Sequence, residues 1–94
     1  MANRHLHIGI VWNGPSKFEQ VQSLIDKVSN VEWMRYGGNC WIIYTSHTPT
    51  QWADYIRPHL NSTDQLVIYE VTNLGQADGW LPEKIWDWLK AFRY

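Results

Sequence analysis

Hydrophobic residues repeat along this chain with two different periods, and the order of these repeats limits the fold more than any other feature. From Leu6 to Trp12 apolar side chains alternate with other side chains, which indicates a strand. Further strands are predicted at Val31–Tyr36, Cys40–Thr45 and Gln65–Val71, and helices at Lys17–Val28, from Thr48 to about Ile56, and at about Pro82–Phe92.

Start and stop signals support the first two helices. Two pairs of residues have the spacing of a capping box, in which a hydroxyl accepts from a free N–H and the later side chain reaches back: Ser16 with Glu19, and Thr48 with Gln51. Pro58 has no N–H to donate, so the second helix should end or kink near Ile56 or Arg57.

The order of elements is strand, helix, strand, strand, helix, strand, followed by a last helix. Two crossovers joined by a hairpin at Gly37-Gly38-Asn39 predict an α+β, ferredoxin-like βαββαβ sandwich with a four-stranded antiparallel sheet. We expect one domain over residues 1–94, with a helical tail from about residue 80. Both crossover helices should lie on one face, so the other face must be wet or covered by the tail or by a second copy.

Charge and cysteine content reduce the number of function classes that fit this chain. The net charge is −1, and the eight Lys and Arg residues are scattered, so the basic run of a strong nucleic-acid binder is missing. A single cysteine allows no internal disulfide and no paired-cysteine metal motif. No apolar run approaches the roughly 20 residues that cross a bilayer. The simplest interpretation is a cytoplasmic protein.

Few side chains suggest chemistry. His5 and His7 share one face of the first strand and could hold a metal together, but no third ligand lies near in sequence, so we interpret them as solvated or half-buried side chains at a strand edge. Cys40 begins an apolar strand and is expected to be an inert buried residue. The carboxylates form no repeated pair. We therefore predict no catalytic residue, no metal ligand and no cofactor.

Aromatic residues near the end of the chain are the remaining candidates. The chain has seven Trp, which favours more apolar surface than one small core can hide. Trp86 and Trp88 are about 200° apart on a helix, so both cannot face one core. Trp80, Trp86 and Tyr94 are therefore our candidate interaction residues. They could cover the open face of their own sheet, form a dimer or partner interface, or stack on bases.

One segment resembles a known family. Residues 39–71 are similar to the second half of the SinR-like relatives of the small CRISPR adaptation subunit. The matching pieces are Trp41 with Thr45, Ile56-Arg57-Pro58, Asp64-Gln65-Leu66-Val67 and Glu70-Val71. The remainder of the chain matches only in the order of its elements.

This resemblance implies a ferredoxin-like fold and a homodimer formed through sheet faces or edges. It also implies binding of duplex DNA and, for some members, metal-dependent nuclease activity that uses an Asp at the end of the first strand. Asn13 stands at that position here. Asn carries no negative charge to hold Mg²⁺, so the prediction leans away from an enzyme.

The leading hypothesis is a non-enzymatic, dimeric protein that binds another macromolecule through its open sheet face and Trp-rich tail. One alternative is a divergent metal-dependent nuclease of the CRISPR adaptation type. Another is a nucleic-acid-binding regulatory or antitoxin-like module.

Overall fold

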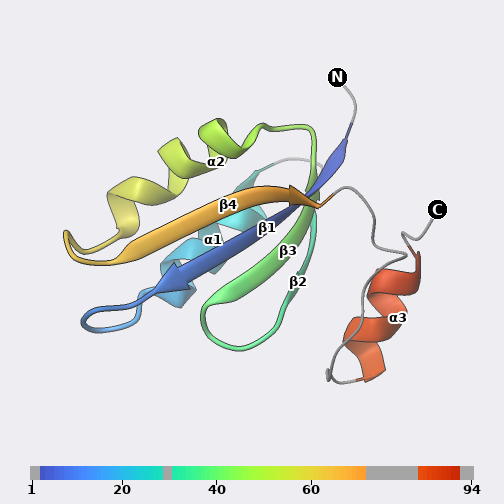
Figure 1. Ribbon diagram of the computed structural model, residues 1–94, viewed down its shortest axis with the longest axis horizontal. Coiled ribbons are helices and arrows are strands. Elements are labelled where there is room, and N and C mark those ends of the chain that lie inside the picture. Colours follow the sequence, from blue (N-terminus) through green and yellow to red (C-terminus); the bar gives the residue numbers. More distant parts are fainter. Residues whose placement is uncertain (1–2, 29–30, 72–82, 92–94) are drawn as a thin grey trace.

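The computed structural model describes residues 3–28, 31–71 and 83–91 (Figure 1). Its elements, in chain order, are β1 (Arg4–Val11), α1 (Phe18–Lys27), β2 (Glu32–Arg35), β3 (Cys40–Thr45), α2 (Pro49–Ile56), the 3-10 turn η1 (Arg57–His59), β4 (Gln65–Val71) and α3 (Glu83–Ala91). The predicted element order is confirmed, and β3 and β4 have the predicted bounds. β1 starts and ends earlier than predicted, because Arg4 still pairs with β3.

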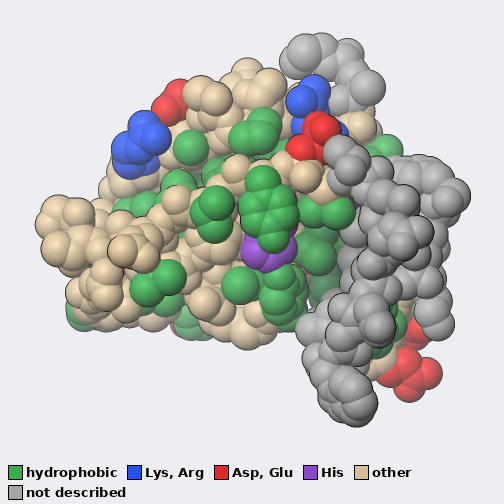
Figure 2. All heavy atoms as spheres, in the orientation of Figure 1, with side chains coloured by type: hydrophobic (Ala, Val, Ile, Leu, Met, Phe, Trp, Pro, Cys, Tyr) green, Lys and Arg blue, Asp and Glu red, His purple; other side chains and the backbone are tan. Residues whose placement is uncertain are grey.

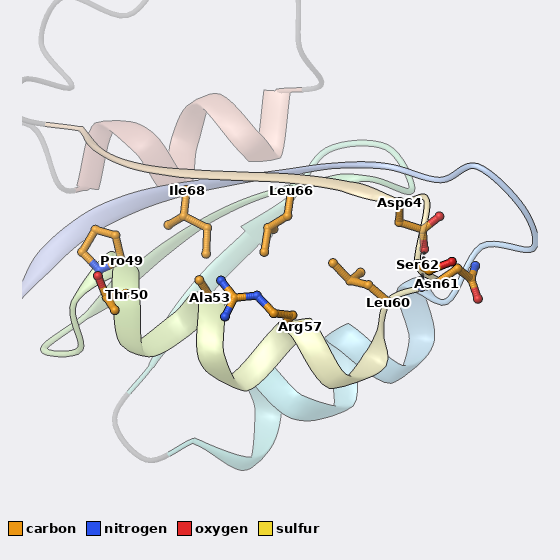
Figure 3. Close-up of a pocket in the computed structure, with 10 residues that line it drawn as sticks. All are labelled: Pro49, Thr50, Ala53, Arg57, Leu60, Asn61, Ser62, Asp64, Leu66 and Ile68. Carbon is orange, nitrogen blue, oxygen red and sulfur yellow. Dashed lines mark hydrogen bonds between the residues drawn. The ribbon is translucent and has the colours of Figure 1, made fainter.

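The four strands form one sheet in the order β2-β3-β1-β4, and every neighbouring pair is antiparallel. This order, with one helix in each β-α-β crossover, is that of the ferredoxin-like fold, and the predicted fold class is confirmed. α1 and α2 lie together on one side of the sheet, whereas α3 lies on the opposite side (Figures 1 and 3).

The hydrophobic core lies between the sheet and the pair α1 and α2. Alternate residues of β1 and β3 point into it and meet the apolar stripe of each helix. The side chains of a strand return to the same face every two residues, and those of a helix about every 3.6 residues. The fully buried members are Leu6, Ile8, Ile10, Val21, Ile25, Trp41, Ile43, Trp52 and Ile56.

The indole N–H groups of Trp41 and Trp52 and the hydroxyl of Thr45 have hydrogen-bond partners at the core boundary. The indole N–H of Trp41 donates to Oε1 of Gln22 at 3.0 Å. The hydroxyl of Thr45 is fully buried and accepts from Nε1 of Trp52 at 3.3 Å and from the backbone N–H of His47 at 3.1 Å. Because an unpaired buried polar atom is costly, these bonds let two indoles and a hydroxyl enter the core.

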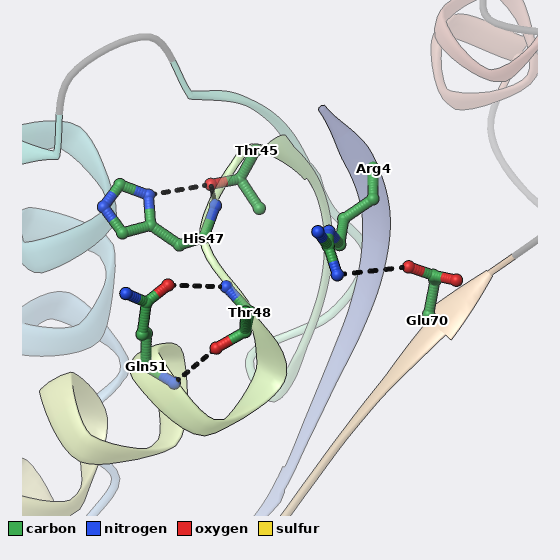
Figure 4. Close-up of polar contacts among 6 residues, drawn as sticks. All are labelled: Arg4, Thr45, His47, Thr48, Gln51 and Glu70. Carbon is green, nitrogen blue, oxygen red and sulfur yellow. Dashed lines mark hydrogen bonds and ion pairs between the residues drawn. The ribbon is translucent and has the colours of Figure 1, made fainter. Parts of the chain in front are cut away.

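Of the two predicted capping boxes, the structure has one. At α2 the backbone N–H of Gln51 donates to Oγ1 of Thr48 at 3.1 Å, and Oε1 of Gln51 accepts from the Thr48 N–H at 2.8 Å, as Figure 4 shows. The predicted capping box of α1 is wrong. Its N-cap is Lys17, with no side-chain bond, because the chain turns into the helix one residue later than Ser16 would require.

The end of α2 follows from Pro58. The α-helix stops at Ile56, and the chain continues for three residues as η1, where Pro58 is tolerated in a first turn. The following loop is held by Asp64, whose carboxylate accepts from the backbone N–H groups of Asn13 and Asn61, each at 2.8 Å. Partial burial opposes ionisation of this carboxyl, but the two backbone bonds outweigh it and hold the pKa of Asp64 below its ordinary value.

Loss of the α2 cap should destabilise the protein. We expect Thr48→Ala to lower the free energy of unfolding by about 1 kcal/mol, because the backbone N–H of Gln51 loses its acceptor. Urea denaturation followed by circular dichroism measures this loss. Thr50→Ala is the matched control, since Thr50 is exposed on the same helix and outside the capping box. Equal losses in the two variants would contradict the capping role.

Candidate functional site

The sheet face turned away from α1 and α2 is the candidate site, and we call it the open face. Directly opposite residues of paired strands point to the same face. The register therefore places on it Glu32, Met34 and Tyr36 from the β2 side, Cys40, Ile42 and Tyr44 from β3, His5, His7, Gly9 and Val11 from β1, and Gln65, Val67, Tyr69 and Val71 from β4.

α3 covers one end of the open face. Ile42 is buried there, and Trp86 and Trp88 pack against the cluster around it together with Met34, Tyr36 and Val71. This packing agrees with one of the alternatives stated above, in which Trp86 covers the open face of its own sheet. The expectation that Trp86 and Trp88 could not share one cluster is wrong, because long indole rings on both flanks of a helix can reach the surface beneath it.

The other end of the open face carries three half-exposed apolar side chains. Val11 is 51% exposed, Val67 55% and Tyr69 50%, and all three lie on the adjacent strands β1 and β4. Figure 2 shows hydrophobic side chains gathered around a histidine on the face turned to the viewer. Beside them Gly9 has no side chain, which leaves a shallow hollow of about 360 Å³ lined by Val11, Cys40 and Val67 among others.

The imidazole of His7 contacts residues at both ends of the open face. The ring of His7 stacks on that of Tyr69, with centroids 4.9 Å apart and planes 17° from parallel. Its Nε2 is hydrogen-bonded to the hydroxyl of Tyr36. Its Nδ1 is buried and has no hydrogen-bond partner among the described residues. We call His7, Tyr36 and Tyr69 the imidazole cluster.

Burial keeps this cluster neutral. It lowers the pKa of His7, because the charged imidazolium would lose its water. It also raises the pKa of Tyr36 to about 12, with Cys40 and Tyr69 adding to the effect. The phenol therefore keeps its proton, and the bond between Tyr36 and His7 joins two uncharged groups.

The structure corrects two expectations about these residues. His5 and His7 lie on one face as predicted, but β1 is a central strand, so they are not at an edge; His5 is buried and His7 partly buried. The ring of Trp88 lies edge-on to His5, with centroids 6.3 Å apart. Cys40 is only partly buried, because its side chain points to the open face instead of the core.

Two of the sequence-predicted site residues, Trp86 and Asn13, lie within the described part of the chain, and they are in different places. Trp86 lies on the open face, whereas Trp80 and Tyr94 fall outside the described residues. Asn13 lies in the loop after β1, where its amide donates to the carbonyl of Thr63. It therefore links two loops at the far end of the sheet from α3 (Figure 1).

Sequence reasoning missed the residues of the imidazole cluster other than His7. The outward positions of β4 alternate as Gln65, Val67, Tyr69 and Val71, which is more apolar than a wet face requires. That pattern was a readable signal. The pairing of His7 with Tyr36 was not, because it depends on which strands become neighbours.

Among the described residues, no three His, Cys, Asp or Glu side chains are grouped so that they could hold a metal ion. Within the same part of the chain, no helix has the length and apolar character needed to cross a membrane.

Comparison with known proteins identifies no family for this chain. No protein-family model matches the chain, and no curated protein does. A de novo designed protein with a ferredoxin fold, solved by solution NMR, is 17% identical, with 84% of this chain and 93% of the designed chain covered and a TM-score of 0.42. The assignment of the fold rests on the strand order and pairing of this chain.

Acid should weaken the fold through the imidazole cluster. The pKa of His7 is lower in the folded chain than in the unfolded chain, so the unfolded chain binds more protons as the pH falls through 6.5. The free energy of unfolding should therefore decrease from pH 7.5 to pH 5.5, and His7→Gln should make this decrease smaller. His5 keeps part of it, because burial lowers its pKa as well. Urea denaturation at both pH values measures the slopes, and equal slopes would contradict the assignment.

Proposed function

We propose that this chain is a non-enzymatic cytoplasmic protein that binds another macromolecule through its open face, and that its first partner is a second copy of itself. The observation that carries the proposal is the group of half-exposed side chains Val11, Val67 and Tyr69 beyond the reach of the Ile42 cluster. Contiguous apolar patches on soluble proteins mark interaction sites.

The chemistry of this end of the open face favours a second copy. The residues here, Gly9, Val11, Cys40, Val67 and Tyr69, include no Asp, Glu, Lys or Arg. A two-fold axis brings identical residues face to face, and an uncharged patch can meet its own copy without like-charge repulsion. The stacked ring of Tyr69 gives the patch a large aromatic contact, which is the residue type that dominates interface energies.

Relationship to the SinR-like family is part of the same proposal. It is supported by the residues quoted above for positions 39–71 and is compatible with a ferredoxin-like dimer. Metal-dependent cleavage of RNA or DNA and salt-sensitive nucleic-acid binding are the assays that separate the two alternatives from this proposal.

A charge placed on the patch should prevent self-association. We expect the mass from light scattering to rise with concentration from 11.1 kDa toward twice that value. Val67→Lys should hold the protein at the monomer mass, because two ammonium groups would face each other across the axis.

Ser23→Lys is the matched control, since Ser23 is exposed on α1, away from the open face, and this variant should associate as the native chain does. A native chain that stays monomeric at every concentration, and finds no other macromolecule to bind, would refute the proposal.

A further inference from the structure

The outer edge of β4 carries backbone groups that no described strand pairs with. β4 is the last strand in the sheet order, and among the described residues no strand pairs with its outer side. The backbone N–H of Ile10 donates to the carbonyl of Asn39 at 2.9 Å, so alternate residues of β1 direct their backbone groups toward β3. The remaining residues of β1 bond to β4 through Gln65, Val67, Tyr69 and Val71. Leu66, Ile68 and Glu70 must therefore direct their N–H and C=O groups outward.

This edge lacks the usual protection. Natural edge strands are kept from pairing by shortness, by Pro or Lys, or by inward charges. β4 has seven residues with neither Pro nor Lys, and its one charge, Glu70, is held by Arg4 at 3.6 Å (Figure 4). The opposite edge, β2, has four residues, and Glu32 and Arg35 are its ends.

A groove runs along the same edge. It lies between β4 and α2, has a volume of about 510 Å³, and is lined chiefly by Pro49, Ala53, Arg57, Leu60, Leu66 and Ile68. Figure 3 shows Leu66 and Ile68 pointing from β4 toward α2, with Ala53 on α2 and Arg57 on η1. Two of the three residues whose backbone groups face outward, Leu66 and Ile68, thus also line the groove with their side chains.

We propose that this edge binds an extended peptide of another protein as a fifth strand, with an apolar side chain opposite Ile68 and an acidic one opposite Leu66. Only an extended backbone can satisfy a row of alternating donors and acceptors. A residue opposite Ile68 would point to the same sheet face as Ile68 and therefore into the groove. This site is separate from the open face and does not depend on the function proposed above.

Charge selects the acidic residue. Arg57 is the cation of the groove, and its present partner is Asp54 at 3.2 Å, with side chains 70% and 63% exposed. Such an exposed pair contributes little. Asp64, at the end of the groove, is already held by two backbone N–H groups. A peptide carboxylate beneath α2 would be less solvated and would form the stronger pair with Arg57.

Amide hydrogen exchange on the ¹⁵N-labelled chain tests the proposal directly. In the free chain, the amides of Leu66, Ile68 and Glu70 should exchange quickly, whereas those of Val67 and Tyr69 are protected by β1. The probe is a blocked heptapeptide, Ser-Thr-Val-Thr-Glu-Thr-Ser. At saturation it should slow the three outward amides by about tenfold and leave the other two unchanged.

Matched controls separate backbone from side-chain recognition. The same peptide with methylated valine and glutamate nitrogens should not bind, because it cannot donate to the edge. Replacing its glutamate by glutamine should weaken binding to the native chain but not to Arg57→Gln. Ala53→Met should fill the groove and weaken binding, whereas Tyr55→Met, on the same helix but outside the groove, should not. Circular dichroism shows whether each variant is folded.

Three results would overturn the proposal. The first is that no amide of the chain changes its exchange rate at millimolar peptide. The second is equal binding of the methylated peptide. The third is protection of the Leu66, Ile68 and Glu70 amides from exchange in the free chain, with protection that rises as the protein concentration rises. A second copy would then occupy the edge.

Discussion

The pairing of the central strand β1 with β3 on one side and β4 on the other is the interaction on which the rest of the structure depends. The two faces of β1 carry different side chains. Leu6, Ile8 and Ile10 are almost completely buried against α1 and α2. The imidazoles of His5 and His7 must therefore lie on the opposite face, where no crossover helix can cover them. The open face exists because both crossover helices take the same side of the sheet, and the β4 edge exists because β4 is the last strand in the sheet order.

This asymmetry explains how His7 becomes partly buried on the open face. His7 is covered by Tyr36 and Tyr69 from strands that are far from it in sequence, and the Tyr36 hydroxyl satisfies one of its two nitrogens. Neutral aromatic side chains can pack on a sheet that way without the cost of a buried charge. The result is an uncharged, partly apolar surface next to α3, which is the kind of surface that suits association with another protein.

The open face and the β4 edge offer two different kinds of contact. The open face presents side chains, so its affinity should depend on shape and apolar area. The edge presents the backbone groups of Leu66, Ile68 and Glu70, so it should accept many sequences and select among them only through the groove beneath α2. Because the two surfaces meet along β4, one chain could hold a second copy and a peptide together.

The sequence by itself determined the order of elements, the fold class, the cap of α2 and its end before Pro58, because each depends on residues close together in the chain. The alternation in β1 also placed His5 and His7 on the face away from the core. Only the tertiary structure decided that Tyr36 and Tyr69 meet His7, that Trp86 and Trp88 share one cluster, and that β4 has a groove at its outer edge. These contacts join residues from different strands and helices, and a periodic pattern carries no information about which neighbour a side chain will meet.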